Sequence, residues 1–211
     1  MAVGLFWHYT GAMNTRILAA AALAALLLPG CYREKLGAPP SGLHRRDPLP
    51  ITFYLDKGAS DAIELGVRES FQLWSDASMF KFVYGGRAAP RVARDGRDQV
   101  VFMARWPNEL PIGQAAWCQA YLDDQGKIVE ADILLNGEAF AFTTAREAKP
   151  GCLYVEDVLA RAIGRSLGIG LGEEGETPDA NRTVKAGEAF EPGIDPAEMA
   201  AYLSLYAASS K

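Results

Sequence analysis

Hydrophobic and polar residues alternate in several short stretches after residue 50, and this spacing is typical of β-strands. The predicted strands cover residues 50–56, 80–84, 99–104, 114–122 and 127–135. The first is rich in β-branched and aromatic residues, and a pair of glycines is expected to end the second. The last two flank a short polar turn ending in a glycine, which readily adopts a positive φ, so they predict a β-hairpin.

Three further segments predict α-helices. In residues 61–76 the hydrophobic side chains recur every three or four positions, and Ser60 or Asp61 supplies the N-cap. Residues 153–167 predict a second helix and residues 195–206 a third. The resulting order of elements, β, α, β, β, β, β, α, α, predicts one α+β domain.

The segment before the first strand has the pattern of an export signal. Its apolar run at residues 17–28 is too short to cross roughly 30 Å of hydrocarbon. Residues 28–31 (Leu-Pro-Gly-Cys) resemble a bacterial lipobox, whose cysteine receives lipid and becomes the new N-terminus. We therefore expect residues 1–30 to be a signal peptide, best started at Met13, and Cys31 to be lipidated.

Residues 31–49 are rich in proline, glycine and basic residues and lack hydrophobic periodicity, which indicates a flexible tether. The chain is then expected to be a lipoprotein of a bacterial cell envelope that faces the periplasm or the cell surface. Its only membrane contact would be the lipid anchor, and residues 50–208 would form the folded domain. A plain secretory signal followed by an incidental cysteine is the alternative.

The amino-acid composition argues against some classes of function for this protein. The chain is 49% hydrophobic and 22% charged, as in globular proteins, and its net charge is −5. Because an acidic domain cannot displace counterions from phosphates, general nucleic-acid binding is not expected. Both histidines, His8 and His44, precede the predicted domain. The domain therefore contains no histidine that could bind a metal ion or act as an acid or base.

The remaining cysteines are Cys118 and Cys152. An even pair in an exported protein predicts a disulfide, for which the chain-entropy model gives roughly 4 kcal/mol of stabilisation. Two buried free thiols are the alternative.

Several short segments, taken in order, resemble the matrixins, the bacterial relatives of matrix metalloproteases among the metzincins. They are Phe71-x-x-Trp74-Ser75, Phe80-Lys81-Phe82, residues 131–136 (Ala-Asp-Ile-Leu-Leu-Asn), the helix and glycine-rich exit at 158–172, and residues 203–206 (Leu-Ser-Leu-Tyr). The resemblance covers residues 50–207. It implies a matrixin-like catalytic-domain fold with a mixed, twisted sheet and three helices.

The zinc-binding motif of that family, HExxHxxGxxH, is degenerate here. Gly164 and Gly168 match its glycines, the second being where the helix must break. The replaced positions are Arg161 and Arg165 for the first two histidines, Ala162 for the catalytic glutamate, Leu171 for the third histidine and Lys185 for the methionine below the metal. Because a guanidinium has no lone pair to donate, the resemblance implies no zinc, no general base and no catalytic residue. A structural Ca²⁺ has no support in the sequence.

The first hypothesis is therefore an inactive matrixin-like domain that binds a peptide or protein along the edge strand of its hairpin, as the family aligns its substrates. Arg161 and Arg165 could offer bidentate contacts to a carboxylate. Alternatively, the acidic residues that follow could neutralise them internally; these are Glu173, Glu174 and Glu176.

Two other functions stay open. A residual hydrolase could use another metal held by Asp123, Asp124, Asp132, Glu156 and Asp157, although their spacing matches no known loop. Ser166 lies in a Gly-x-Ser-x-Gly sequence, but it falls within a predicted helix and has no histidine to activate it. The third possibility is an envelope lipoprotein with a purely structural role.

Overall fold

The computed structural model describes residue 45, residues 50–169 and residues 190–207. The chain divides into two compact units, residues 1–35 and 36–211, and the described residues belong to the second. No helix among them is long and apolar enough to span a bilayer. The predicted signal peptide, Cys31, Leu171 and Lys185 lie outside the described residues.

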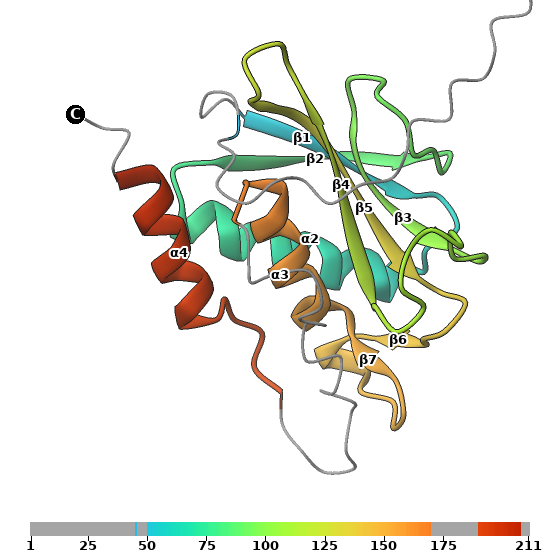
Figure 1. Ribbon diagram of the computed structural model, residues 1–211. Coiled ribbons are helices and arrows are strands. Elements are labelled where there is room, and N and C mark those ends of the chain that lie inside the picture. The colour runs from blue at the N-terminus through green and yellow to red at the C-terminus, as the bar shows by residue number, and fades with distance from the viewer. Residues whose placement is uncertain (1–44, 46–49, 170–189, 208–211) are drawn as a thin grey trace, which may run out of the picture. The chain divides into compact units, whose positions relative to one another are not determined.

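A mixed five-stranded sheet forms the centre of the domain (Figure 1). Its strands are β1 (Pro50–Asp56), β2 (Lys81–Ala88), β3 (Asp98–Met103), β4 (Ala116–Leu122) and β5 (Ile128–Asn136). The spatial order is β2-β1-β3-β5-β4, and all neighbouring pairs are parallel except β4 with β5. The predicted α+β class is confirmed, and the hairpin places β4 at an outer edge of the sheet.

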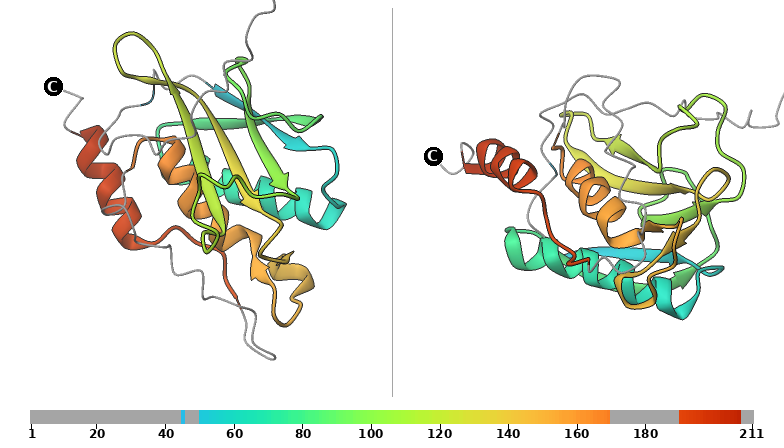
Figure 2. Two further views of the ribbon diagram at one scale, coloured as in Figure 1. Left: turned by 45° about the vertical axis from the view of Figure 1, so that its right-hand side comes forward. Right: turned by 90° about the horizontal axis from the view of Figure 1, so that it is seen from below.

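Three helices accompany the sheet in the described residues: α2 (Asp61–Ala77), α3 (Val155–Ser166) and α4 (Pro196–Ala207). Ser60 caps α2, since its side chain accepts a hydrogen bond from the Ile63 N–H at 3.3 Å. Helices α2 and α3 pack on the same face of the sheet, and α4 packs beside α3 (Figure 2). Two short strands, β6 (Phe142–Thr143) and β7 (Leu153–Tyr154), and a 3-10 turn at Ala145–Glu147 were not predicted.

The strand predicted to end at its two glycines continues through them as β2. A Cβ atom on Gly85 would lie 2.6 Å from a ring carbon of Tyr54 in the neighbouring strand β1. The lack of a side chain on Gly85 therefore leaves room for the ring of Tyr54 beside β2. The interpretation of Gly85 as the end of the strand was wrong.

The main core lies between the sheet and the two helices. Trp74 of α2 is fully buried there, and its indole N–H donates to the carbonyl of Ala160 in α3 at 2.7 Å. Phe53 of β1 stacks on Phe71 of α2. These contacts fix how α3 lies on the sheet.

The structure contradicts the predicted disulfide, because Cys118 and Cys152 are both free. Cys118 lies in β4, where its side chain packs with Ile128 and Ala131. Cys152 directly precedes β7 in the separate two-stranded sheet. Cys152 itself lies in no strand, and the alternative of free thiols describes this structure.

Arg45 was assigned to the flexible tether but is buried in the domain. Its guanidinium pairs with Asp98 and donates to the carbonyl of Ser166 at 3.1 Å. Its backbone N–H donates to the hydroxyl of Tyr206 at 2.9 Å. At this residue the domain therefore begins earlier than the boundary predicted at Pro50, because the half-buried Asp98 and the end of α3 accept hydrogen bonds from it.

Candidate functional site

Helix α3 carries the residues of the degenerate motif. It ends in a Schellman motif: the N–H of Gly168 donates to the carbonyl of Arg165 at 2.9 Å, and the N–H of Ile169 to that of Gly164 at 3.1 Å. Gly168 has a φ of 85°, which a residue with a Cβ adopts only at a cost. The prediction that this glycine stops the helix is confirmed.

Gly164 lies where α3 meets α2. A Cβ atom at this position would be 3.1 Å from Trp74, whose ring is fully buried and held by its hydrogen bond to Ala160. The glycine therefore has a packing role inside the core. Ala162, at the position of the family's glutamate, is also buried in the core, with 2% of its surface exposed.

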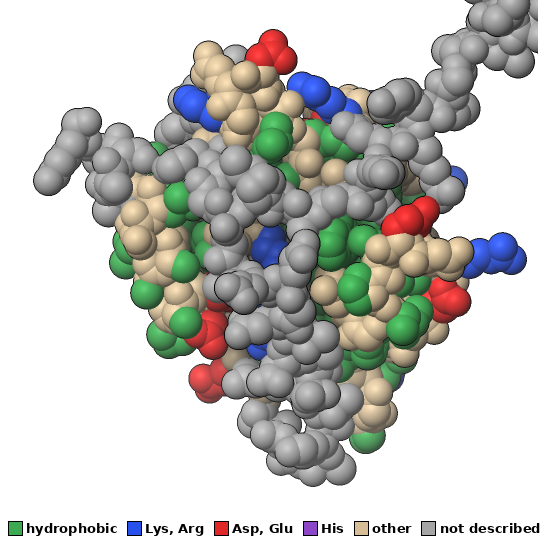
Figure 3. Space-filling view, in the orientation of Figure 1, with side chains coloured by type: hydrophobic (Ala, Val, Ile, Leu, Met, Phe, Trp, Pro, Cys, Tyr) green, Lys and Arg blue, Asp and Glu red, His purple; other side chains and the backbone are tan. Residues whose placement is uncertain are grey.

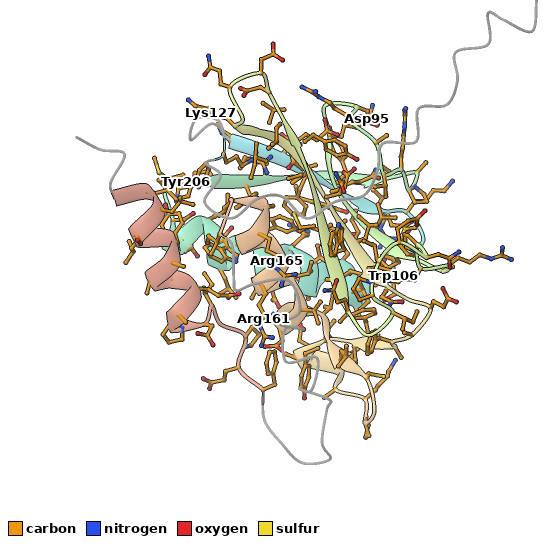
Figure 4. The ribbon with its side chains drawn as sticks, in the orientation of Figure 1. Asp95, Trp106, Lys127, Arg161, Arg165 and Tyr206 are labelled. Atoms are coloured by element: carbon orange, nitrogen blue, oxygen red, sulfur yellow. The ribbon has the colours of Figure 1, made fainter. Side chains whose placement is uncertain are left out.

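Arg161 and Arg165 lie one turn apart on α3, and both are half-buried (Figure 4). Arg161 forms an ion pair with Asp157 at 3.6 Å. Arg165 forms no hydrogen bond or ion pair with any residue that the structure describes. Burial lowers the pKa of Arg165, and the charge of Arg161 lowers it further, whereas Glu198 raises it. Lys or Arg side chains are visible near the middle of the face of the domain that Figure 3 shows.

Glu198, at the start of α4, was not predicted to belong to the site. It is 3% exposed, and burial raises its pKa to about 7 although Arg161 and Arg165 lower it. Neither carboxylate oxygen accepts a hydrogen bond of ordinary geometry, although the backbone N–H of Asp195 is directed at the carboxylate. The sequence Asp195-Pro196-Ala197-Glu198 has the capping-box pattern, which predicts a helix start but not a neighbouring arginine.

Glu173, Glu174 and Glu176, the residues expected to neutralise the arginines, lie outside the described residues. Among the residues that are described, Asp157 and Glu198 carry the opposite charge. We refer to Arg161, Arg165 and Glu198 as the arginine site.

The thiol of Cys118 on β4 borders this site. Burial raises the pKa of Cys118 to about 12, and the charges of Arg45 and Arg165 oppose that shift. The thiol is therefore protonated at neutral pH and is not an activated nucleophile. Helix α3 packs against β4, the strand that carries Cys118.

The zinc ion implied by the resemblance does not fit these residues. Arg161 and Arg165 offer only N–H donors, and the positive charges would repel the ion. In the part of the chain that the structure describes, no group of three or more His, Cys, Asp or Glu side chains is placed to hold a metal ion.

The acidic residues considered as ligands of another metal ion, and the candidate nucleophile Ser166, lie in separate parts of the domain. Asp123 accepts N–H groups in the hairpin turn, Asp132 lies in β5, and Glu156 accepts the N–H of Ala145 at 3.0 Å. Asp124 is exposed in the hairpin turn, and Asp157 pairs with Arg161 in α3. The buried hydroxyl of Ser166 donates to the carbonyl of Ile163 at 2.7 Å.

The outer edge of β4 is the second part of the candidate site. Among the described residues this strand pairs only with β5. The N–H of Asn136 donates to the carbonyl of Ala115, so these two residues form a hydrogen-bonded pair. In an antiparallel ladder only every second residue of a strand bonds to the partner strand, so the backbone groups of residues 116, 118 and 120 point away from β5. The carbonyl of Ala120 accepts a bond from the Gln119 side chain at 3.3 Å. Helix α3 packs against β4, so this edge and the arginine site adjoin.

No model of a known protein family matches the chain, and no curated protein is significantly similar to it.

Proposed function

We propose that the protein is an exported, lipid-anchored and non-catalytic relative of the matrixins, whose domain binds an extended peptide or protein segment along the edge of β4. One observation carries this proposal: the outer edge strand packs against the helix that bears Arg161 and Arg165. A groove that aligned a substrate over a metal ion would have this arrangement.

The relationship to matrixins is supported by the position of the motif. The helix with the Gly164 and Gly168 spacing lies beside the only antiparallel strand of the five-stranded sheet. A family assignment would have been weakened if this helix had packed away from an edge strand. Both glycines have structural roles that do not depend on a metal ion, so they can persist after its ligands are lost.

The loss of catalysis follows from the side chains. A metal-bound water has a pKa near 7, compared with 15.7 in bulk water, so a site without the metal lacks its nucleophile at neutral pH. Ala162 has no group that can accept a proton. What these residues can still provide is a shaped surface with positive charge.

Binding would occur by β-augmentation. The N–H and C=O groups of Ala116, Cys118 and Ala120 would pair with the main chain of an added strand. Main-chain pairing supplies affinity without sequence preference, whereas the neighbouring charges would supply selectivity.

The test uses peptides without free termini, so that backbone pairing is probed without a terminal charge. A mixture of short, N-acetylated and C-amidated peptides of random sequence is titrated into the full chain and followed by NMR. We expect the amide signals of Ala116, Cys118 and Ala120 to shift. The amides of β2, at the opposite edge of the sheet, are the internal control.

Ala120→Pro removes one outward N–H without removing a bond to β5, since proline is tolerated at strand edges. We expect this variant to bind the mixture at least roughly tenfold more weakly, the equivalent of about 1.4 kcal/mol. Ala120→Val keeps the N–H and should bind as the wild type does. If the β4 amides of the wild type do not respond, or if Ala120→Pro binds unchanged, the proposal is wrong.

A further inference from the structure

The guanidinium of Arg165 is partly removed from water, and its N–H groups donate no hydrogen bond to the described residues. Removing a guanidinium from water is costly unless an acceptor replaces the lost hydration. Its planar fork of N–H donors matches the two oxygens of a carboxylate, to which it binds bidentately. The position therefore suits a carboxylate that a ligand brings to it.

Among the described residues, the internal candidate for that role does not fill it. Glu198 is coupled electrostatically to Arg165, but neither of its oxygens accepts a hydrogen bond from the guanidinium. The charged groups that influence Glu198 are Arg161 and Arg165 on α3 and Asp195 at the start of α4. A ligand carboxylate that reaches Arg165 would thus enter the field of two arginines and one buried glutamate.

The protonation state of Glu198 then determines whether its carboxyl group repels the ligand carboxylate or donates a hydrogen bond to it. Burial raises the pKa of Glu198 to about 7, so both protonation states are populated at neutral pH. The ionised form would repel a carboxylate, whereas the neutral form can donate its O–H to one of the ligand oxygens. Binding therefore favours the neutral form.

We propose that Arg165 and Glu198 form a proton-linked site for a carboxylate, with the guanidinium donating to both oxygens and protonated Glu198 donating to one of them. Where Glu198 is ionised before binding, its carboxylate takes up one proton, which the buffer releases, and forms its O–H bond as the complex forms; no other covalent bond forms or breaks. The assignment of this carboxylate to the free C-terminus of the bound peptide rests on the proposed function.

N-acetylglycine is the probe, because it carries one carboxylate and one amide and stays ionised across neutral pH. N-acetylglycinamide is the matched neutral compound. Each is titrated calorimetrically into the full chain at about pH 5.5 and about pH 8.5, in buffers of different ionisation enthalpy, which reports proton uptake. We expect binding of the acid only, with affinity falling about tenfold for each pH unit above the pKa of Glu198.

Two variants assign the effect to residues. Arg165→Gln should abolish binding of N-acetylglycine, whereas Arg94→Ala, which removes an exposed arginine, should leave it unchanged. Glu198→Gln keeps a hydrogen-bond donor that does not titrate, so it should bind the acid with the pH dependence removed. The wild-type comparison of acid with amide needs no variant and stands even if Arg165→Gln does not fold.

Equal binding of acid and amide, no binding of the acid at either pH, or an unchanged pH dependence in Glu198→Gln would each overturn the carboxylate site. If N-acetylglycine fails while amidated peptides still shift the β4 amides, this inference falls and the proposed function stands. If N-acetylglycine binds while the β4 amides never respond to peptides, the carboxylate site stands and its assignment to a bound peptide falls.

Discussion

At the scale of single residues, the domain holds several carboxyl groups in places where water cannot solvate them. Asp132 on β5 is 1% exposed; one oxygen accepts the N–H of Ala93 at 3.1 Å and the hydroxyl of Tyr121 at 3.3 Å, and the other has no partner. Burial raises the pKa of Asp132 to about 8, and the nearby charge of Glu130 contributes. The group therefore favours folding in its neutral form.

This shift predicts a pH dependence of stability. Because the folded-state pKa of Asp132 lies above its unfolded value, the folded state binds the extra proton. The stabilisation is present below about pH 4 and is lost as the pH rises towards 8. Asp132→Asn should therefore be more stable than the wild type at about pH 9, by about 1 kcal/mol or more, and its stability should vary less with pH.

Urea denaturation at a series of pH values measures this effect. Asp124→Asn, on the exposed hairpin turn, is the control and should follow the wild type. If Asp132→Asn and the wild type lose stability in parallel between about pH 5 and about pH 8, the raised pKa of Asp132 is not responsible.

At the scale of elements, the end of α3 decides where the arginine site lies. The Schellman motif turns the chain directly after Leu167, whose backbone carbonyl accepts a hydrogen bond from the hydroxyl of Tyr206 on α4. The helix end is thereby fixed to α4, the helix that carries Glu198. A glycine with positive φ is the local feature that makes this junction possible.

Gly168→Ala should lower the free energy of unfolding by about 1 to 2 kcal/mol, because alanine pays for the left-handed backbone conformation. Chemical denaturation measures the loss. Gly113→Ala is the matched control, since a Cβ atom there meets nothing within 4 Å and its φ is not positive. A Gly168→Ala variant as stable as the control would show that the chain leaves α3 in another way.

At the scale of the whole molecule, Arg45 connects four parts of the domain. It precedes β1 and forms a parallel bridge with Ile128 of β5, pairs with Asp98 of β3, and donates to the carbonyl of Ser166 in α3. Its backbone N–H binds Tyr206 of α4. Arg45, which the sequence assigned to a tether, thus contacts the same helix ends that position the arginine site.

Arg45→Ala should cost about 3 kcal/mol of stability, because the half-buried carboxylate of Asp98 then keeps the N–H of Ala131 as its donor but loses its opposite charge. The double variant Arg45→Ala with Asp98→Asn should recover part of this loss, since the uncompensated charge is then removed. Arg94→Ala, on the surface, should have an effect below about 0.5 kcal/mol. Thermal and urea denaturation of the four proteins test these expectations. A single variant Arg45→Ala with wild-type stability would show that the contacts of Arg45 do not stabilise the domain.

The sequence by itself determined the local elements and the positions of Arg161, Ala162 and Arg165 on α3. Helix periodicity, the Ser60 cap and the Gly126 and Gly168 turns act within a few residues, so their effect can be read from short stretches of chain. Tertiary structure alone decided that Glu198 and Cys118 lie close enough to influence the charge of Arg165, that Arg45 bonds to the neighbouring Ser166, and that the two cysteines stay apart. These contacts join residues separated by long stretches of chain, 121 positions between Arg45 and Ser166, and they depend on how the sheet orders its strands. Charge and burial at the site follow from that packing, which no local pattern encodes.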